Sequence, residues 1–285
     1  MKIPDNTIIL SIDISVSNLD KSLDFYSRLI GFKEISRDVK TVFLSANGKP
    51  PYIISLAENK NGKHPSRNNT GLYHVAIKLP DRKELAKVFL RLFKNNTKFH
   101  GFSDHIVSEA IYLADPDGNG VELYIDKPRE TWKWTLGQVE MDTLPLNLQV
   151  ITNELGENET ITDGIHPDTK IGHIHLKVSD LFKAEKFYNH LLGFNVTNSS
   201  YPGALFLSAG GYHHHIGTNV WSSKNGTPPP DDTLGLKTFT ISIPDEKYIE
   251  EIEKNAKNYG IETAKQNNGK VFLNDFDNNK IILTL

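Results

Sequence analysis

The segment VSNLDKSLDFYSRLIGF, residues 16–32, decides the fold because it occurs twice. Residues 178–194 read VSDLFKAEKFYNHLLGF, so a Phe-Tyr pair and a Gly-Phe pair recur at an offset of 162. In both copies apolar residues return every three or four positions, which predicts a helix with one buried face. Asn18 or Asp20 can cap the start of this helix, and Gly31 can end it. Two long matching segments at one offset indicate a duplicated chain.

The rest of the chain repeats at a slowly increasing offset. Residues 43–46, Phe-Leu-Ser-Ala, return 163 positions later, and the pair Gly71-Leu72 returns 164 positions later. Residues 8–16 alternate apolar and polar side chains, beginning with Ile8, which predicts a strand with these apolar residues on one face. The pattern indicates an α+β fold of four strand–helix–strand modules. We place the modules at about 7–58, 71–126, 171–221 and 235–285, which makes 1–126 and 171–285 the two halves and 127–170 a polar connection.

Composition narrows the function classes. The chain has 285 residues, 38% of them hydrophobic, with a formal charge of −3, as in an ordinary globular protein. The chain has no excess of basic residues that would indicate nucleic-acid binding. No stretch approaches the roughly 20 apolar residues of a membrane span. Because cysteine is absent, only His, Asp and Glu remain as strong metal ligands. The first residues read as a strand rather than an export signal, so we expect a cytoplasmic protein, either monomeric or homo-oligomeric.

Residues 105–122, HIVSEAIYLADPDGNGVE, carry the most unusual chemistry of the chain. A His and a Tyr precede a turn in which Pro116 and Gly118 supply the backbone angles, and Glu122 follows in the returning strand. A carboxylate between apolar neighbours is costly to bury without a partner or a metal. The internal copy has other residues at the three polar positions: His105, Tyr112 and Glu122 correspond to Lys265, Phe272 and Ile282.

The modules and this segment together resemble the vicinal oxygen chelate superfamily, whose βαβββ modules pair around a metal. The resemblance covers nearly the whole chain and implies two half-open barrels of the glyoxalase/bleomycin-resistance/extradiol dioxygenase type. The segment itself is similar to the signature of extradiol ring-cleavage dioxygenases, in particular the four-module catechol 2,3-dioxygenases. Ser103 departs from the usual residue, and the matching positions are His105, Ile111, Tyr112, Asp115, Pro116, Gly118 and Glu122.

The repeats assign the remaining polar candidates to the second and third modules. His74 corresponds to Thr238, and His173 corresponds to Ser11. If modules 2 and 3 share a barrel, His74, Glu122 and His173 form the facial triad of non-haem Fe(II) oxygenases. Better-known extradiol enzymes pair neighbouring modules of one half, in the opposite order. If modules 1 and 2 paired here, the third ligand would have to come from a residue other than Ser11.

Three consecutive histidines, residues 213–215, provide the candidate for proton transfer. In a strand, His213 and His215 face one way and His214 the other, so the three cannot bind one ion together. The resemblance implies an active-site histidine two residues before an aliphatic one. That spacing selects His214, followed by Ile216, with His213 or His215 as the alternatives.

The resemblance implies an Fe(II)-dependent extradiol dioxygenase that cleaves catechol or a substituted catechol with O2 to a muconic semialdehyde. His214 would move substrate protons, and His105 and Tyr112 would hydrogen-bond a substrate oxygen. Mn(II) is the alternative metal, and Zn(II) an adventitious occupant of the same ligands. Two other functions stay open. A glyoxalase-like isomerase or thiol transferase would use four protein ligands, and a non-catalytic aromatic-ligand binding protein would retain no metal.

Overall fold

The structure is a computed structural model that describes residues 1–156 and 163–285. Each of the first two modules has a leading strand, a helix and three further strands. The first consists of β1 (Ile8–Val16), α1 (Leu19–Leu23), the π-helical η1 (Asp24–Ile30), β2 (Lys33–Arg37), β3 (Thr41–Ser45) and β4 (Ile54–Glu58). The second consists of β5 (Gly71–Lys78), α2 (Arg82–Lys94), β6 (Phe99–Asp104), β7 (Ser108–Ala114) and β8 (Gly120–Asp126).

The second half repeats this order after a connection that has structure of its own. The connection contains η2 (Arg129–Thr131), β9 (Trp134–Thr135), β10 (Gln138–Val139), β11 (Leu144–Pro145) and α3 (Leu148–Thr152). The third module contains β12 (Lys170–Lys177), α4 (Leu181–Glu185), η3 (Lys186–Leu191), β13 (Asn195–Asn198), β14 (Ala204–Ser208) and β15 (Ile216–Asn219). The fourth contains β16 (Gly235–Ser242), α5 (Glu246–Ala256), η4 (Lys257–Tyr259), β17 (Thr263–Lys265), β18 (Val271–Asn274) and β19 (Lys280–Thr284). No helix in the described ranges is long and apolar enough to span a membrane.

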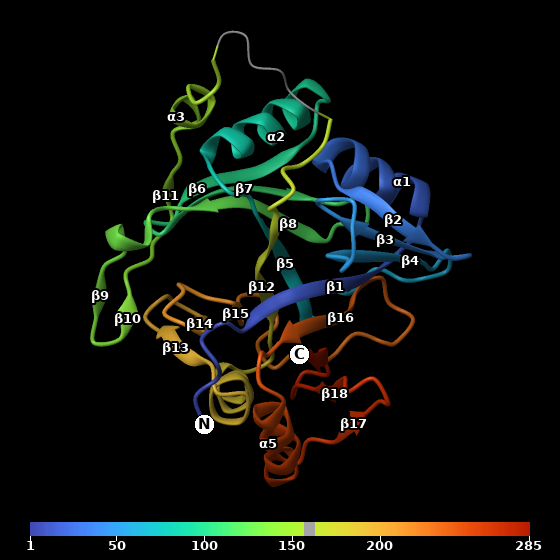
Figure 1. Ribbon diagram of the computed structural model, residues 1–285, viewed down its shortest axis with the longest axis vertical. Helices are drawn as coiled ribbons and strands as arrows, with labels where there is room; N and C mark the ends of the chain where they lie inside the picture. Colours follow the sequence, from blue (N-terminus) through green and yellow to red (C-terminus); the bar gives the residue numbers. More distant parts are fainter. Residues whose placement is uncertain (157–162) are drawn as a thin grey trace.

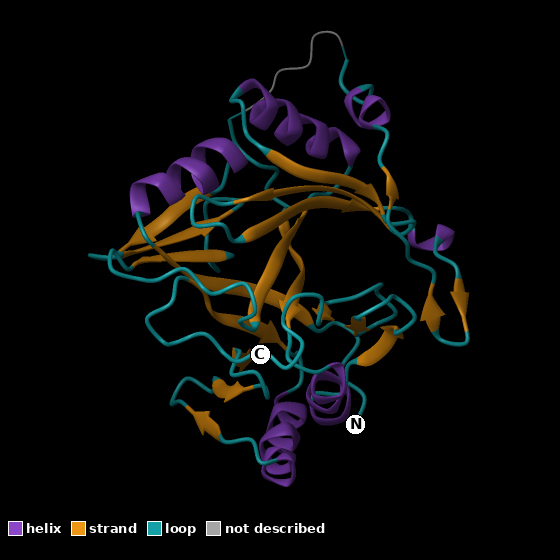
Figure 2. Cartoon of the chain, turned by 180° about the vertical axis from the view of Figure 1, so that it is seen from behind, coloured by secondary structure: helices purple, strands orange, loops and turns teal. Residues whose placement is uncertain are grey.

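Apart from β9 and β10, which pair only with each other, the described strands form two curled sheets, each of which draws on both halves of the chain (Figures 1 and 2). The first sheet has eight strands in the order β17-β18-β19-β16-β1-β4-β3-β2. The second has nine, in the order β11-β6-β7-β8-β5-β12-β15-β14-β13. Antiparallel pairing of β1 with β16 joins modules 1 and 4, and antiparallel pairing of β5 with β12 joins modules 2 and 3. The pairing of modules 2 and 3 predicted from the polar residues is therefore confirmed, and modules 1 and 2 do not share a barrel.

The duplicated helix begins and ends at the predicted residues, but its second part is π-helical. Asn18 and Asp180 each accept a hydrogen bond, at 2.9 Å, from the backbone N–H three residues later. Gly31 ends the first copy with φ 104°, in the left-handed region that suits glycine. The wider π-helical turn lets the consecutive residues Phe25 and Tyr26 both reach the core.

The expected alternation of β1 is wrong at its first residues. Ile8 is 38% exposed, whereas Ile9, predicted on the opposite face, is 2% exposed. The pairing register of β1 with β16 shifts between Ile9 and Ser11, and such an irregularity moves side chains from one face to the other. Beyond the shift, Ile12, Ile14 and Val16 are buried as the pattern predicts.

Candidate metal centre and active-site cavity

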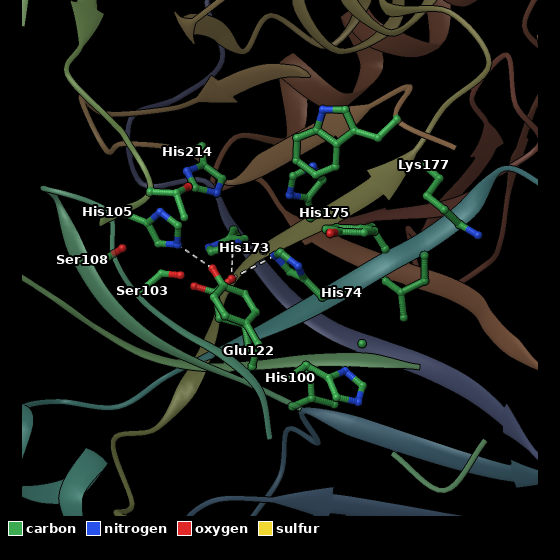
Figure 3. Close-up of a pocket in the computed structure, with 18 of the residues that line it drawn as sticks. His74, His100, Ser103, His105, Ser108, Glu122, His173, His175, Lys177 and His214 are labelled. Atoms are coloured by element: carbon green, nitrogen blue, oxygen red, sulfur yellow. Dashed lines mark hydrogen bonds and ion pairs between the residues drawn. The ribbon is translucent and has the colours of Figure 1, made fainter. Parts of the chain in front are cut away.

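Three neighbouring strands of the nine-stranded sheet bring the predicted ligands together. His74 lies on β5, Glu122 on β8 and His173 on β12, and all three are buried (Figure 3). A carboxylate oxygen of Glu122 lies 2.9 Å from Nε2 of His74 and 3.2 Å from Nε2 of His173. The two Nε2 atoms are 3.3 Å apart. One donor atom from each residue thus lies within 4.8 Å of the others, the span of a single metal ion's ligands.

The protonation states of this group fit a cation. Burial lowers the pKa of His173 to about 4, although Glu122 favours the charged imidazole. Burial would raise the pKa of Glu122, but charge interaction and hydrogen bonds with His173 and His74 hold it well below its usual range. At neutral pH the group therefore combines one carboxylate with a neutral imidazole at His173, the ligand types of a facial triad. Nδ1 of His173 is buried and has no hydrogen-bond partner in the described residues, so a metal bond at Nε2 would fix the ring.

His105 and Tyr112 form a hydrogen-bonded pair beside the metal centre. Nδ1 of His105 lies 2.8 Å from the carbonyl oxygen of Asp142, which can only accept, so Nδ1 carries a proton. In the neutral ring Nε2 then accepts the Tyr112 hydroxyl at 2.7 Å. The Tyr112 oxygen keeps its lone pairs for another donor. Burial, with a contribution from Glu122, raises the pKa of Tyr112 well above its usual value, so the group stays a phenol.

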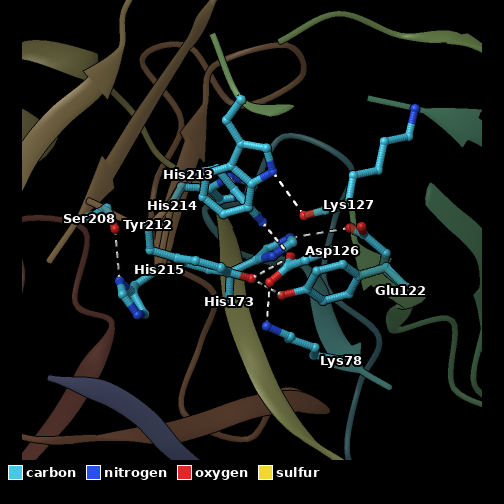
Figure 4. A network of polar contacts seen from close by, with 12 residues as sticks. Lys78, Glu122, Asp126, Lys127, His173, Ser208, Tyr212, His213, His214 and His215 are labelled. Atoms are coloured by element: carbon cyan, nitrogen blue, oxygen red, sulfur yellow. Dashed lines mark hydrogen bonds and ion pairs between the residues drawn. The ribbon is translucent and has the colours of Figure 1, made fainter. Parts of the chain in front are cut away.

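The three consecutive histidines precede β15 instead of lying in a strand, which corrects the prediction. Each of the three side chains still has a different environment. His214 lines the cavity, with its ring centroid 4.0 Å from that of His173. His215 turns to the Ser208 hydroxyl at 3.0 Å, and His213 turns to the carboxylate of Asp126 at 3.0 Å (Figure 4).

The contacts of His213 bear on the proton positions of His214. Because the carboxylate of Asp126 only accepts, Nε2 of His213 donates to it. Nδ1 of His213 lies 2.7 Å from Nδ1 of His214, so one of the two carries the shared proton (Figure 4). With His213 neutral, the lone pair of His214 lies at Nε2; with His213 protonated, it lies at Nδ1. Burial lowers the pKa of His214 well below its usual value.

The cavity around these groups has a volume of about 720 Å³, within the size range of small-molecule sites. One wall is aromatic: the ring centroid of Tyr73 lies 5.1 Å from that of His175 and 5.3 Å from that of Trp221. Tyr201 and Phe206 also line it. A flat ring could stack there while its polar groups reach the metal centre.

The barrel of modules 1 and 4 has a different polar group at the corresponding place. Asp13, which aligns with His175, accepts hydrogen bonds from the hydroxyls of Tyr52, Ser55 and Thr238. Thr238 is the counterpart of His74. This carboxylate is held by hydroxyl groups, where the other barrel presents imidazoles, so its contacts suit a scaffold role for modules 1 and 4.

Asp126 anchors a polar network beneath the metal centre. Its carboxylate accepts from Tyr212 at 2.9 Å and from His213 at 3.0 Å, and it pairs with Lys78. Burial would raise the pKa of Asp126, but His213 and Lys78 lower it to about 2. A carboxylate whose pKa is depressed by folding stabilises the fold at every pH above its pKa in the unfolded chain, which is near 4. This stabilisation is lost as the pH falls toward about 2, the pKa in the folded protein.

We therefore predict an acid-dependent difference between the native protein and Asp126→Asn. Above about pH 5 the native protein should be more stable by roughly 2 kcal/mol, the value of a pKa shift of this size. The difference should shrink as the pH falls from about 4 to about 2. Urea unfolding at a series of pH values measures it, and a difference that does not change with pH would contradict the assigned charge of Asp126.

Gly172 marks a close contact in the same network. A Cβ at this position would lie 1.6 Å from the hydroxyl oxygen of Tyr124. Tyr124 is fully buried, and its hydroxyl oxygen lies 2.7 Å from that of Tyr212. We expect Gly172→Ala to destabilise the fold by about 1–3 kcal/mol or more, as overpacking does. Gly101→Ala is the matched control, because nothing lies within 4 Å of its Cβ. Equal denaturation midpoints for the two variants would show that Tyr124 can move aside.

Several cavity residues were not predicted as site residues from the sequence. Asp142 comes from the connection between the halves and positions His105. Tyr201 and Trp221 lie outside the strands, where periodicity says nothing about their direction. Lys177 could have been found, because the residue at i+4 of a strand shares the face of His173, as His175 does at i+2.

Comparisons with known proteins agree with this architecture. The family model for the Glyoxalase/Bleomycin resistance protein/Dioxygenase superfamily matches residues 8–123 and 170–283. A catechol-2,3-dioxygenase of Bacillus subtilis is 41% identical over 259 residues, covering 90% of this chain and 89% of that one. A biphenyl-2,3-diol 1,2-dioxygenase of Rhodococcus globerulus is 25% identical over 130 residues, 44% of this chain and 68% of that one. The crystal structure of glyoxalase I from Zea mays superposes with a TM-score of 0.58 at 18% identity, covering 98% of this chain and 92% of that one, a likeness of fold.

Proposed function

Because the chain belongs to the Glyoxalase/Bleomycin resistance protein/Dioxygenase superfamily, we propose that it is an Fe(II)-dependent extradiol dioxygenase. Its substrates would be O2 and catechol or a substituted catechol, and its product a muconic semialdehyde. One observation carries the proposal: His74, Glu122 and His173 converge in the cavity that also holds His105, Tyr112 and His214. The B. subtilis relative, a catechol-2,3-dioxygenase, supports the same activity.

The proposed ligands are His74, Glu122 and His173, with Fe(II) as the metal and Mn(II) as the alternative. Iron bound by these residues would supply the electron exchange between an aromatic diol and O2. Zn(II) fits the same donors but has no redox chemistry. A glyoxalase-like function is less well supported, because the ligand group in the described residues has a single carboxylate.

The protein's own groups would manage the protons of the substrate. We assign His214 as the acid–base residue, since its Nε2 has no hydrogen-bond partner among the described residues and its Nδ1 is held by His213. Taking a proton at Nε2 would let the diol bind as an anion, and returning it would complete the ring opening. His105 and Tyr112 would steady the other substrate oxygen, because Tyr112 can accept from a substrate hydroxyl. The aromatic wall would align the ring and keep water away.

The test is reconstitution of the metal-free protein with Fe(II) under anaerobic conditions, followed by catechol and air. One O2 should be consumed for each catechol, with a yellow product and no activity in the Zn(II)-loaded control. Bound iron without turnover of catechol or alkylcatechols would refute the dioxygenase assignment. Failure to retain any metal would instead favour a binding protein for aromatic ligands.

A further inference from the structure

The face of β12 that carries the ligand His173 continues to a lysine at the far end of the strand. His173, His175 and Lys177 alternate along β12, so their side chains share one face, and all three line the cavity. In Figure 3, Lys177 and His105 lie on opposite sides of Glu122. The cavity thus has a diol-binding side near His105 and a cationic side near Lys177.

Lys177 has no countercharge of its own. It is partly buried, and within the described residues its ammonium group makes no hydrogen bond or ion pair. Burial lowers the pKa of Lys177. A half-buried ammonium group without a partner is costly, and an anion beside it would remove much of that cost.

The carboxylates that line the cavity lie elsewhere. Glu122 is engaged by the two histidines of the metal centre. Asp142 is on the other side, where its carbonyl oxygen contacts His105 and its carboxylate accepts from the backbone of Thr143. Arg67 adds a second cation to the lining and forms no ion pair in the part of the chain that the structure describes. The excess positive charge is therefore open to a ligand.

Distance and shape fit a substituted aromatic ring between the two sides. Four residues of strand separate the Cα atoms of His173 and Lys177 by about 13 Å. In Figure 3 the ammonium end of Lys177 points away from the metal centre. Turned back along the strand, this side chain and a ring bound at the metal centre would together span the gap. The ring would lie against Tyr73, His175 and Trp221, with its substituent directed toward the ammonium group.

We propose that the cavity selects catechols with a carboxylate on a ring substituent and that Lys177 binds this carboxylate. The proposal rests on the dioxygenase function above and names its substrate class. Lys177 is a specificity residue here, since it contacts the substituent and not the reacting atoms. One hydrogen bond between charged groups corresponds to a preference of about tenfold to a hundredfold.

The test compares catechols that carry a carboxylate on zero, one or two methylene groups at position 4, each with its methyl ester. For the iron-loaded native protein, kcat/KM of at least one acid should exceed that of its ester at least about tenfold. In Lys177→Met this ratio should fall to near one, and in Lys177→Glu it should invert. Anaerobic calorimetry should give the same ratio in Kd, independent of turnover.

Lys170→Met is the matched control, because Lys170 lies at the other end of β12 and does not line the cavity. It should keep the native ratio. The inference would be overturned if the native protein preferred the esters, or if Lys177→Met left the acid-to-ester ratio of kcat/KM unchanged. In either case turnover of the esters would leave the dioxygenase function intact. If no catechol of either kind is consumed by the iron-loaded protein, the proposed function itself fails.

Discussion

Glu122→Gln is expected to abolish stable binding of Fe(II). The change keeps the size of the side chain but removes the negative charge that two buried histidines now share. Loss of a bound carboxylate should weaken the site more than the roughly 10–100-fold that follows loss of an outer-shell partner alone. Iron content after anaerobic reconstitution and desalting measures the effect. His74→Ala should give the same result, because it removes a second of the three proposed ligands.

The internal repeat provides the control for this prediction. Thr238→Ala alters the counterpart of His74 in the other barrel, where the hydroxyl contacts Asp13, and it should leave iron binding unchanged. Circular dichroism of the metal-free variants separates loss of ligands from loss of folding. Native iron content in folded Glu122→Gln would contradict the assignment of this carboxylate as a ligand.

His214→Ala should retain iron and lose turnover. The proposed role is proton transfer at Nε2, and removal of such a group costs about 10²–10⁴-fold in rate. His214 packs on His173 with its ring centroid 4.0 Å away, but its Nδ1 is engaged by His213 and it stands outside the ligand group. Single-turnover measurements on the anaerobic catechol complex, mixed with O2, isolate the chemical step from substrate binding.

His190→Ala is the control for this experiment, because His190 is exposed on η3 and does not line the cavity. Its turnover should equal that of the native protein. Complete loss of iron in His214→Ala would mean that this histidine is a ligand. Unchanged turnover would transfer the acid–base role to His105, a cavity histidine whose nitrogens contact Asp142 and Tyr112.

Internal repetition made the module order and the convergence of His74, Glu122 and His173 predictable. The polar residues occur in the second and third copies and not in their counterparts, and the pairing of β5 with β12 places them in one barrel. No local pattern could state this pairing, because it joins strands about 100 residues apart. The asymmetry between copies indicated it, since the ligands of one metal must converge on one point.

The errors come from local irregularity. A register shift in β1 exposes Ile8, and residues 213–215 leave the strand geometry just before β15. Strand alternation assumes regular backbone, so it fails at both places. Asp142 and Trp221 reach the cavity from segments without periodicity, and only the tertiary structure reveals their positions. Lys177 was within reach of the sequence pattern, but a lysine at a strand end is ordinarily a solvated residue.

The most direct test of the central claim is the fate of oxygen in the product. The iron-loaded protein should convert catechol under ¹⁸O2 to 2-hydroxymuconic semialdehyde, with mass spectrometry showing incorporation of label from O2 and ring opening beside the diol. The same preparation of Glu122→Gln should form none. A product opened between the two hydroxyl-bearing carbons, or no product from protein that holds iron, would contradict the account.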